Sequence, residues 1–171
     1  DAIYNVLHPM VQGKVNKVGA SFGIVTATID GEDFDFAIPR KKETKTGDGH
    51  ADFSVDLDPS PSIESDLGRR DFTINAIAQS GDGKFVDPFN GVDDIHDGLI
   101  RAVGNAASRF KEDPLRMLRA FQFASRLSTP EGVPFTIEKE TMEAISQLGH
   151  TIKTSISGDR IMGEFDKAWT K

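Results

Sequence analysis

The chain has 171 residues, enough for one compact domain with an appendage and for a substantial hydrophobic core. Lysine and arginine total 20 and aspartate and glutamate total 27, so the net charge of −7 argues against a protein that coats nucleic acid through its overall charge. Because there is no cysteine, a disulfide framework and a thiolate metal site are excluded. No segment reaches the roughly 18 apolar residues of a membrane span, so we expect a cytoplasmic protein without a membrane partner.

A β-hairpin is the first element that the sequence predicts. Residues 17–29 are rich in Val, Ile, Thr and Phe, and residues 32–38 alternate between polar and apolar side chains. Between them stands Asp30-Gly31, a dipeptide typical of a two-residue hairpin turn. The sequence therefore predicts two antiparallel strands joined by this turn.

Two carboxylates share one face of the second predicted strand. Strand alternation places Asp33 and Asp35 on the same side, opposite Phe34 and Phe36. Paired hard oxygen ligands suit a Mg²⁺ ion that also binds a triphosphate. The alternative is an ordinary solvent-facing side of a half-exposed sheet.

The next segment predicts a loop, a strand and a helix start. Residues 40–50 are polar and contain glycine, which is typical of a mobile loop, and residues 51–57 alternate as a third strand would. Ser60 is a suitable N-cap and Pro61 suits the first position of a helix.

The second half of the chain is predicted to be mainly helical. Residues 84–87 indicate a short strand, followed by a turn at Pro88, Asn90 and Gly91. From about Gly104 the apolar spacing becomes helical, and the predicted helices are 114–127, 137–148 (with Gly149 as a stop signal) and 158–170. In the first of these helices, the predicted core side chains are Met117, Leu118, Phe121 and Ala124. This pattern predicts an α/β fold, more closely α+β, with a small mixed or antiparallel sheet in residues 1–102 and a helical part in residues 103–171.

A string of mixed charge stands at residues 69–76, which read Arg-Arg-Asp-Phe-Thr-Ile-Asn-Ala. Guanidinium groups bind phosphate oxygens, whereas Asp71 and Asn75 can hydrogen-bond a ribose or a base edge. These two residues are four positions apart, so a helix would place them on one side. The alternative is a charged helix end whose Asp and Arg side chains pair locally.

A second string stands at residues 112–119, which read Glu-Asp-Pro-Leu-Arg-Met-Leu-Arg. It lies in a locally basic stretch, because residues 101–126 contain six Lys and Arg against two acids. An arginine in the first turn of a helix interacts unfavourably with the helix dipole, so we expect Arg116 to have a role other than stabilising this helix. The alternative is that Asp113 caps a helix and Arg116 is solvated.

Both strings resemble the signature motifs of class II tRNA nucleotidyltransferases and bacterial poly(A) polymerases, which add nucleotides to RNA 3′ ends without a template. The resemblance implies a nucleotidyltransferase head followed by a helical neck. It also implies transfer of CMP or AMP from CTP or ATP to an RNA 3′ end, with tRNA as the expected RNA and Mg²⁺ as the cofactor. Residues 87–91, with Asp94 and Arg101, resemble the family's motif that links head and neck, for which a simple turn is the alternative.

The same resemblance implies roles for individual residues. Asp35 would bind the metal, and Asp33 would either share that role or be a neighbour without one. Asp113 and Arg116 would read the base of the incoming nucleotide, since aspartate only accepts and arginine only donates hydrogen bonds. Arg119 would reach the phosphates. The full set of implied nucleotide-binding residues is Arg69, Arg70, Asp71, Asn75, Asp113, Arg116 and Arg119.

One family motif does not occur in this sequence. The chain contains no Gly-Gly-x-Val-Arg-Asp stretch, and Asp1 with the residues after it resembles the segment that follows this motif in the family. The head is therefore expected to be incomplete at its N-terminus. Three alternatives remain open: a nucleotidyltransferase, a noncatalytic nucleotide- or RNA-binding module, and half of a split enzyme with a partner chain that supplies the missing motif. The motifs do not distinguish complete CCA, partial CCA and poly(A) as products.

Overall fold

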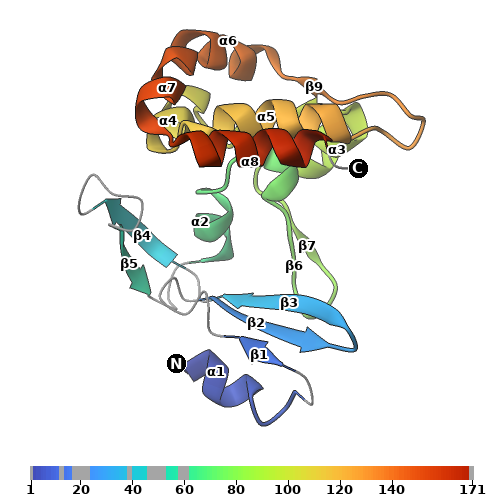
Figure 1. Cartoon of the computed structure of the whole chain (residues 1–171). Helices are drawn as coiled ribbons and strands as arrows, with labels where there is room; N and C mark the ends of the chain where they lie inside the picture. Colours follow the sequence, from blue (N-terminus) through green and yellow to red (C-terminus); the bar gives the residue numbers. More distant parts are fainter. Residues whose placement is uncertain are drawn as a thin grey trace. The chain divides into compact units, whose positions relative to one another are not determined.

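The computed structural model describes residues 2–11, 14–16, 24–37, 40–45, 53–57 and 62–169. The chain folds as two compact units, residues 1–62 and 63–171 (Figure 1). The predicted boundary at residue 102 falls inside the second unit, and the division into a head and a neck stays a prediction. The expectations for Asp1, residues 17–23, Ser60 and Pro61 lie outside the described residues.

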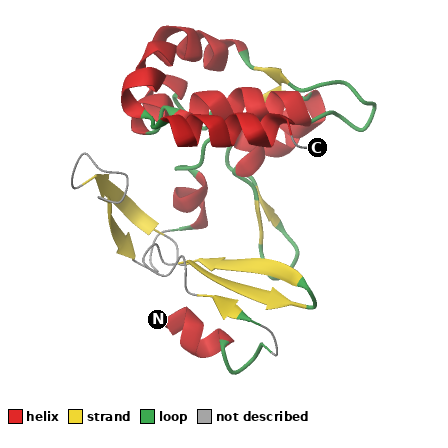
Figure 2. Cartoon of the chain, viewed as in Figure 1, coloured by secondary structure: helices red, strands yellow, loops and turns green. Residues whose placement is uncertain are grey.

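The described residues of the first unit form one short helix and two small antiparallel sheets (Figure 2). Strands β1, β2 and β3 form one sheet in that order, and β4 pairs with β5 in the other. The elements of this unit are α1 (Ala2–Leu7), β1 (Val15–Asn16), β2 (Ile24–Ile29), β3 (Glu32–Ala37), β4 (Arg40–Lys45) and β5 (Phe53–Leu57).

The predicted hairpin is confirmed by strands β2 and β3. They pair antiparallel from Ile24↔Ala37 to Ile29↔Glu32, so Asp30 and Gly31 form a two-residue turn. Both turn residues have positive φ, 52° at Asp30 and 86° at Gly31, a conformation that explains why a short polar residue and a glycine stand there.

The predicted mobile loop at residues 40–50 is wrong over its first half. Residues Arg40–Lys45 form β4, which pairs antiparallel with β5, the predicted third strand. The polar composition of residues 40–50 gave no sign of a strand. Residues 40–45 are extended because their backbone pairs with β5, and a strand at a sheet edge needs no apolar sequence. Residues 46–50 lie outside the described part of the chain.

The second unit is mainly helical, with two short two-stranded sheets, antiparallel β6–β7 and parallel β8–β9. None of the described helices is long and apolar enough to cross a membrane. The elements are α2 (Ile63–Leu67), η2 (Thr73–Asn75), β6 (Ala78–Gln79), β7 (Phe85–Val86), α3 (Gly91–Asp97), β8 (Leu99–Ile100), α4 (Ala106–Glu112), α5 (Leu115–Arg126), β9 (Thr136–Ile137), α6 (Lys139–Leu148), η3 (Gly149–Thr151), α7 (Ile152–Ser155) and α8 (Gly158–Trp169).

The predicted helices 114–127, 137–148 and 158–170 correspond to α5, α6 and α8. Helix α6 ends at Leu148 as predicted, and the chain continues from Gly149 as a 3₁₀ turn. Helix α3 was not predicted, since the turn expected at Asn90-Gly91 is the start of this helix. Phe121 was expected in the core, but its side chain is 47% exposed, because the buried side of α5 centres on Met117 and Ala120.

The core of the second unit lies beneath α4, α5 and α6. Its fully buried members come from the first string, from β8 and from the helices; they are Phe72, Ile100, Phe110, Met117 and Ala120. Burial of large apolar side chains of this kind contributes roughly 1.5–3 kcal/mol each. Together with the small sheets of the first unit, these helices confirm the predicted α+β class with small antiparallel sheets.

Candidate nucleotide-binding site

The first string, residues 69–76, is anchored in the core by its phenylalanine. Phe72 is fully buried, adopts an extended backbone with φ −126° and ψ 153°, and forms a bridge with Ala102. The Thr73 N–H donates to the carbonyl of Arg101, and the Val103 N–H donates to that of Asp71. The string therefore runs beside residues 101–103, with a 3₁₀ turn at 73–75 in place of the α-helix that would bring Asp71 and Asn75 together.

Asp71 is the point where the two strings meet. Its Oδ1 accepts hydrogen bonds from the Phe72 N–H at 2.9 Å and from Asn75 Nδ2 at 3.1 Å, and its Oδ2 accepts from Arg119 Nε at 2.8 Å. Its side chain is only 10% exposed, so these donors replace water around the carboxylate. Asn75 thus contacts Asp71 despite the absence of an α-helix.

Arg119 is held from two sides. Besides the ion pair with Asp71, its guanidinium lies 5.1 Å from the ring centroid of Phe123, within reach of a cation–π interaction. Phe123 in turn packs edge to face against Phe72. Arg119 is therefore a link between the strings in this structure, and its predicted contact with phosphates stays a prediction.

The two arginines at the start of the first string both lie beside Asp66 of helix α2. Arg69 Nε donates to Asp66 Oδ1 at 3.0 Å, and Arg70 Nη2 lies 3.7 Å from Asp66 Oδ2. Arg70 Nη1 also donates to the carbonyl of Asn75. The Arg70 side chain remains 48% exposed, so it can contact a ligand in solution. Sequence reasoning missed Asp66, which stands three and four positions before these arginines.

Arg116 reaches from helix α5 to the first string. Its Nη2 donates to the carbonyl of Arg69 at 3.0 Å, while Nη1 donates to the carbonyl of Arg109 and to Glu112 Oε2. The side chain is 18% exposed, so the alternative of a freely solvated arginine is wrong. Of its five N–H groups three have partners among the described residues, which leaves Nε–H and one Nη2–H for a ligand.

Glu112 pairs directly with both Arg116 and Arg109. Its Oε2 accepts from Arg116 and its Oε1 accepts from Arg109, whose Nη1 also donates to the carbonyl of Gly68. Arg109 therefore joins the end of α4 to the residue that precedes the first string. The positive charge of residues 101–126 is thus largely paired with acidic side chains of the second unit.

Asp113 stands between helices α4 and α5. Its Oδ1 accepts from the Leu115 N–H at 3.1 Å, so it caps the start of α5, as the structural alternative for this residue predicts. Its Oδ2 lies 3.6 Å from Arg160 Nη2 of helix α8. The carboxylate is partly exposed and retains acceptor capacity, so capping does not exclude base reading.

A buried ion pair fixes the far end of the first string. Asp94 is almost fully buried; it accepts from Thr73 Oγ1 at 2.6 Å and from Arg101 Nε at 3.0 Å. The hydrogen bond with Asp94 raises the pKa of Arg101 above its ordinary value, against the opposing effect of burial. Asp87 caps α3 by accepting from the Gly91 and Val92 N–H groups. The predicted linking motif therefore holds Thr73 in place.

Glu138 extends this network to helix α6. Burial on its own would raise the pKa of this carboxyl, but hydrogen bonds from the Thr141 N–H and hydroxyl, with the charge of Arg101, lower the pKa below its ordinary value. Thr141 Oγ1 also accepts from the Ala102 N–H. Residues 101 and 102, beside the first string, are thus tied to the start of α6.

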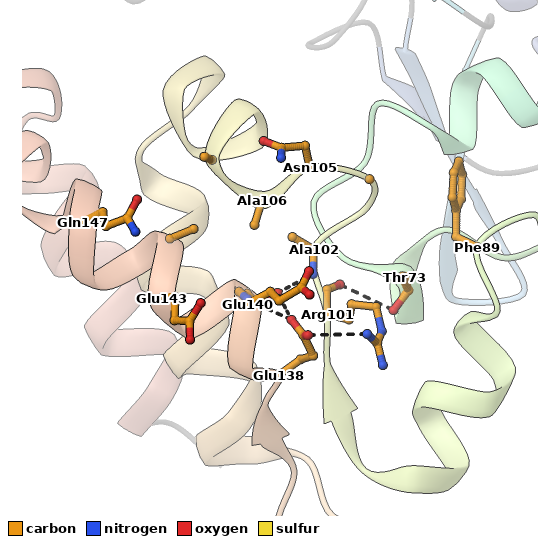
Figure 3. A pocket seen from close by; sticks show the side chains of 14 residues that line it. Thr73, Phe89, Arg101, Ala102, Asn105, Ala106, Glu138, Glu140, Glu143 and Gln147 are labelled. Carbon is orange, nitrogen blue, oxygen red and sulfur yellow. Dashed lines mark hydrogen bonds and ion pairs between the residues drawn. The ribbon is translucent and has the colours of Figure 1, made fainter.

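A cavity of about 380 Å³ lies next to this network (Figure 3). Its polar lining includes Thr73, Arg101, Asn105 and the glutamates Glu138, Glu140 and Glu143. Thr73 belongs to the first string, but none of the predicted nucleotide-binding residues lines this cavity. Three carboxylates repel a triphosphate, so we place the candidate nucleotide site at the two strings instead.

The two candidate metal ligands belong to the first unit. Asp35 Oδ1 accepts from Thr26 Oγ1 and Asp33 Oδ1 accepts from Thr28 Oγ1, both at 2.7 Å, across the β2–β3 hairpin. The partner threonines confirm that both carboxylates lie on one face, and both residues are exposed. The described residues include no group of three or more His, Cys, Asp or Glu side chains that could hold a metal ion.

Comparison with known proteins places most of the chain in the family that its sequence motifs resemble. Residues 2–101 match the family described as "Poly A polymerase head domain", and residues 134–168 match "Probable RNA and SrmB- binding site of polymerase A". The CCA-adding enzyme of Lactobacillus johnsonii is 41% identical over 90% of this chain and 36% of its own length. The chain thus spans about a third of the length of the curated relatives it matches.

Solved structures agree with these sequence matches. The crystal structure of the Bacillus stearothermophilus CCA-adding enzyme in complex with CTP is 37% identical, with a TM-score of 0.73, over 91% of this chain and 34% of that one. A CCA-adding enzyme in apo form II is 27% identical with a TM-score of 0.76, over 99% of this chain and 38% of that one. The chain therefore belongs to the family of class II CCA-adding enzymes and poly(A) polymerases.

Proposed function

We propose that this chain contains the nucleotide-selecting part of a template-independent RNA nucleotidyltransferase that adds CMP or AMP from CTP or ATP to the 3′ end of tRNA. The observation that carries this proposal is the arrangement of Arg116 and Asp113. Arg116 is fixed by three hydrogen bonds with two donors left over, and Asp113 presents a carboxylate at the start of the same helix. Family membership and the likeness to a CCA-adding enzyme crystallised with CTP support it.

The donors and acceptors of these two residues explain a preference for cytosine and adenine. Both bases carry an amino group, N4 or N6, next to a ring nitrogen that accepts a hydrogen bond. Asp113 only accepts and Arg116 only donates, so the pair complements both bases. Uracil and guanine present the reverse pattern, a carbonyl oxygen next to a ring N–H, and would leave the carboxylate facing an oxygen.

The first string supplies contacts to the sugar and the triphosphate in this proposal. Arg70 is half exposed and offers its charge to phosphate oxygens, and Arg69 lies next to it. Asp71, oriented by Asn75 and Arg119, would accept a hydrogen bond from the ribose 2′-hydroxyl. A contact of this kind selects ribonucleotides over deoxyribonucleotides.

The chemistry of the donor set at Asp33 and Asp35 fits Mg²⁺. Each carboxylate uses one oxygen to accept from a threonine, which leaves the other oxygen for an ion. Magnesium in phosphoryl-transfer sites is commonly held by one or two carboxylates with substrate phosphates and water. Asp35 is the proposed ligand and Asp33 its neighbour; bound Mg²⁺ would supply Lewis-acid activation of the phosphate and the hydroxyl.

The proposed reaction is an in-line displacement. The RNA 3′-hydroxyl oxygen forms a bond to the α-phosphorus of CTP or ATP, the bond from this phosphorus to the bridging oxygen breaks, and pyrophosphate leaves. The proton of the hydroxyl passes to solvent or to a carboxylate. The residues of this chain contribute by holding the base, the sugar and the phosphates in place, which is the main source of catalysis in phosphoryl transfer.

The direct test is incorporation into a tRNA trimmed at its 3′ end. We expect the purified chain with Mg²⁺ to extend this tRNA with labelled CTP and ATP and not with UTP or GTP. Arg126→Ala, which removes an exposed arginine from the same helix α5, is the control and should keep the preference. Binding of CTP without any incorporation would contradict the enzyme and favour a noncatalytic module.

A further inference from the structure

Arg160 of helix α8 contacts the proposed base-reading carboxylate from outside both strings. Its Nη2 lies 3.6 Å from Asp113 Oδ2, and both side chains are partly exposed. Helix α8 packs beside α5, as Figure 1 shows for these two helices, so the backbone that bears Arg160 is fixed next to the start of α5. Arg160 therefore lies where it can set the orientation of Asp113.

The charges of the second unit single out this contact. The other acids in and beside the strings are matched by arginines of the strings or of α4: Asp66 with Arg69 and Arg70, Asp71 with Arg119, and Glu112 with Arg109 and Arg116. Asp113 differs, because Arg160, which pairs with it, belongs to helix α8 and lies 47 positions further along the chain. Arg160 lies within residues 134–168, the segment that matches the second family description.

The two oxygens of Asp113 have different partners. Oδ1 is used by the Leu115 N–H, which fixes the side chain at the helix start. Oδ2 faces Arg160, so each carboxylate oxygen has its own partner on a different side. Rotation of the carboxylate plane about the Cβ–Cγ bond would weaken both contacts, so the Arg160 guanidinium helps to hold the plane in one orientation. An acceptor that discriminates between an amino group and a carbonyl oxygen must be held in this way.

We propose that Arg160 is a specificity-determining positioning residue, which holds the Asp113 carboxylate in the orientation that accepts a hydrogen bond from the amino group of cytosine or adenine. The inference rests on the proposed function, since it concerns the residue that reads the base. It assigns Arg160 no contact with the nucleotide. Its effect is on the choice of base and not on the chemical step.

The test compares kcat/KM for CTP and for UTP with the same trimmed tRNA. Arg160→Ala is expected to reduce the CTP:UTP ratio about tenfold, the equivalent of one weakened hydrogen bond. Arg160→Lys, which keeps the charge, should restore part of the ratio. Lys153→Ala, which removes an exposed cation from helix α7, is the matched control and should leave it unchanged. The thermal midpoint of each variant shows whether the fold is retained.

A double-mutant cycle separates positioning from a general structural effect. In an Asp113→Asn background, Arg160→Ala should cause no further loss of the CTP:UTP ratio, because the carboxylate that it positions is gone. An unchanged or increased ratio in Arg160→Ala, or equal losses in both backgrounds, would overturn the inference. If the unaltered chain itself shows no preference for CTP over UTP, the proposed function fails, and this result is distinct from a failure of Arg160 alone.

Discussion

Arg119 donates a hydrogen bond from Nε to Asp71 Oδ2 at 2.8 Å, across 48 positions of the sequence. This contact joins the two charged strings, one on helix α5 and the other beside residues 101–103. Arg116, one turn earlier on α5, donates to the carbonyl of Arg69. The strings are therefore joined in one hydrogen-bonded network, which lies beside a buried core that includes Phe72 and Met117.

Removal of Arg119 should destabilise the second unit. Arg119→Gln leaves the largely buried Asp71 carboxylate without its charged donor, and we expect the free energy of unfolding to fall by about 1–3 kcal/mol. Urea denaturation measures this change. Arg126→Gln, an exposed arginine on the same helix, should change it by less than about 0.5 kcal/mol. Equal effects of the two substitutions would show that the contact with Asp71 is unimportant.

Gly91→Ala should displace the first string. A Cβ at this position would overlap the carbonyl group of Thr73 and touch Ile77, so the backbone must shift at a cost of about 1–3 kcal/mol. Gly163→Ala is the control, because it meets no atom within 4 Å in the middle of helix α8 and should stabilise by up to about 1 kcal/mol. A thermal midpoint for Gly91→Ala equal to that of the unaltered chain would contradict the close packing.

The stability of the second unit should fall at acid pH partly through Glu138. The pKa of this carboxyl is lowered in the folded state, so its stabilising contribution is fully present above the unfolded-state value of about 4.3. The contribution is lost as the pH falls through the lower, folded-state pKa. Glu138→Gln should therefore be less stable than the unaltered chain near neutrality, and the difference should shrink in this acid range. If urea denaturation gives a difference in the free energy of unfolding between the two proteins that does not change with pH, the pKa of Glu138 is not lowered by folding.

Substitutions on the β2–β3 hairpin test the proposed metal ligands. Asp35→Asn should reduce nucleotide incorporation roughly 100-fold or more, since a metal ion supplies several kcal/mol of transition-state stabilisation. Asp33→Asn should have a smaller effect. Glu32→Gln, on the opposite face of β3, is the control and should retain activity. Calorimetric binding of CTP without Mg²⁺ should be unaffected by all three, and full activity of Asp35→Asn would exclude Asp35 as a ligand.

Local chemistry made part of this structure predictable from the sequence. The hairpin follows from residues 30 and 31, whose positive φ angles suit aspartate and glycine. Helices α5 and α8 follow from apolar spacing. The resemblance of the two strings to family motifs correctly indicated the family, and the shared face of Asp33 and Asp35 follows from strand alternation.

Long-range partners were not predictable in the same way. The pairing of β4 with β5 gives a polar segment a strand conformation that its composition conceals. Phe121 fits the helical period of the core, yet it is exposed, because neighbouring elements decide which side of α5 is covered. The partners of Asp113 and Asp71 in tertiary structure, Arg160 and Arg119, are 47 and 48 positions away and leave no periodic signal.

The preference of Asp113→Asn among the four nucleotides is the sharpest test of base reading by Asp113 and Arg116. An asparagine of the same shape can still cap α5, but its amide also donates, so it no longer opposes a carbonyl oxygen of the base. If Asp113 reads the base, kcat/KM for CTP relative to UTP falls at least about tenfold in this variant while the thermal midpoint is unchanged. A variant that incorporates CTP and ATP with the same preference over UTP and GTP as the unaltered chain would contradict base reading by Asp113 and Arg116.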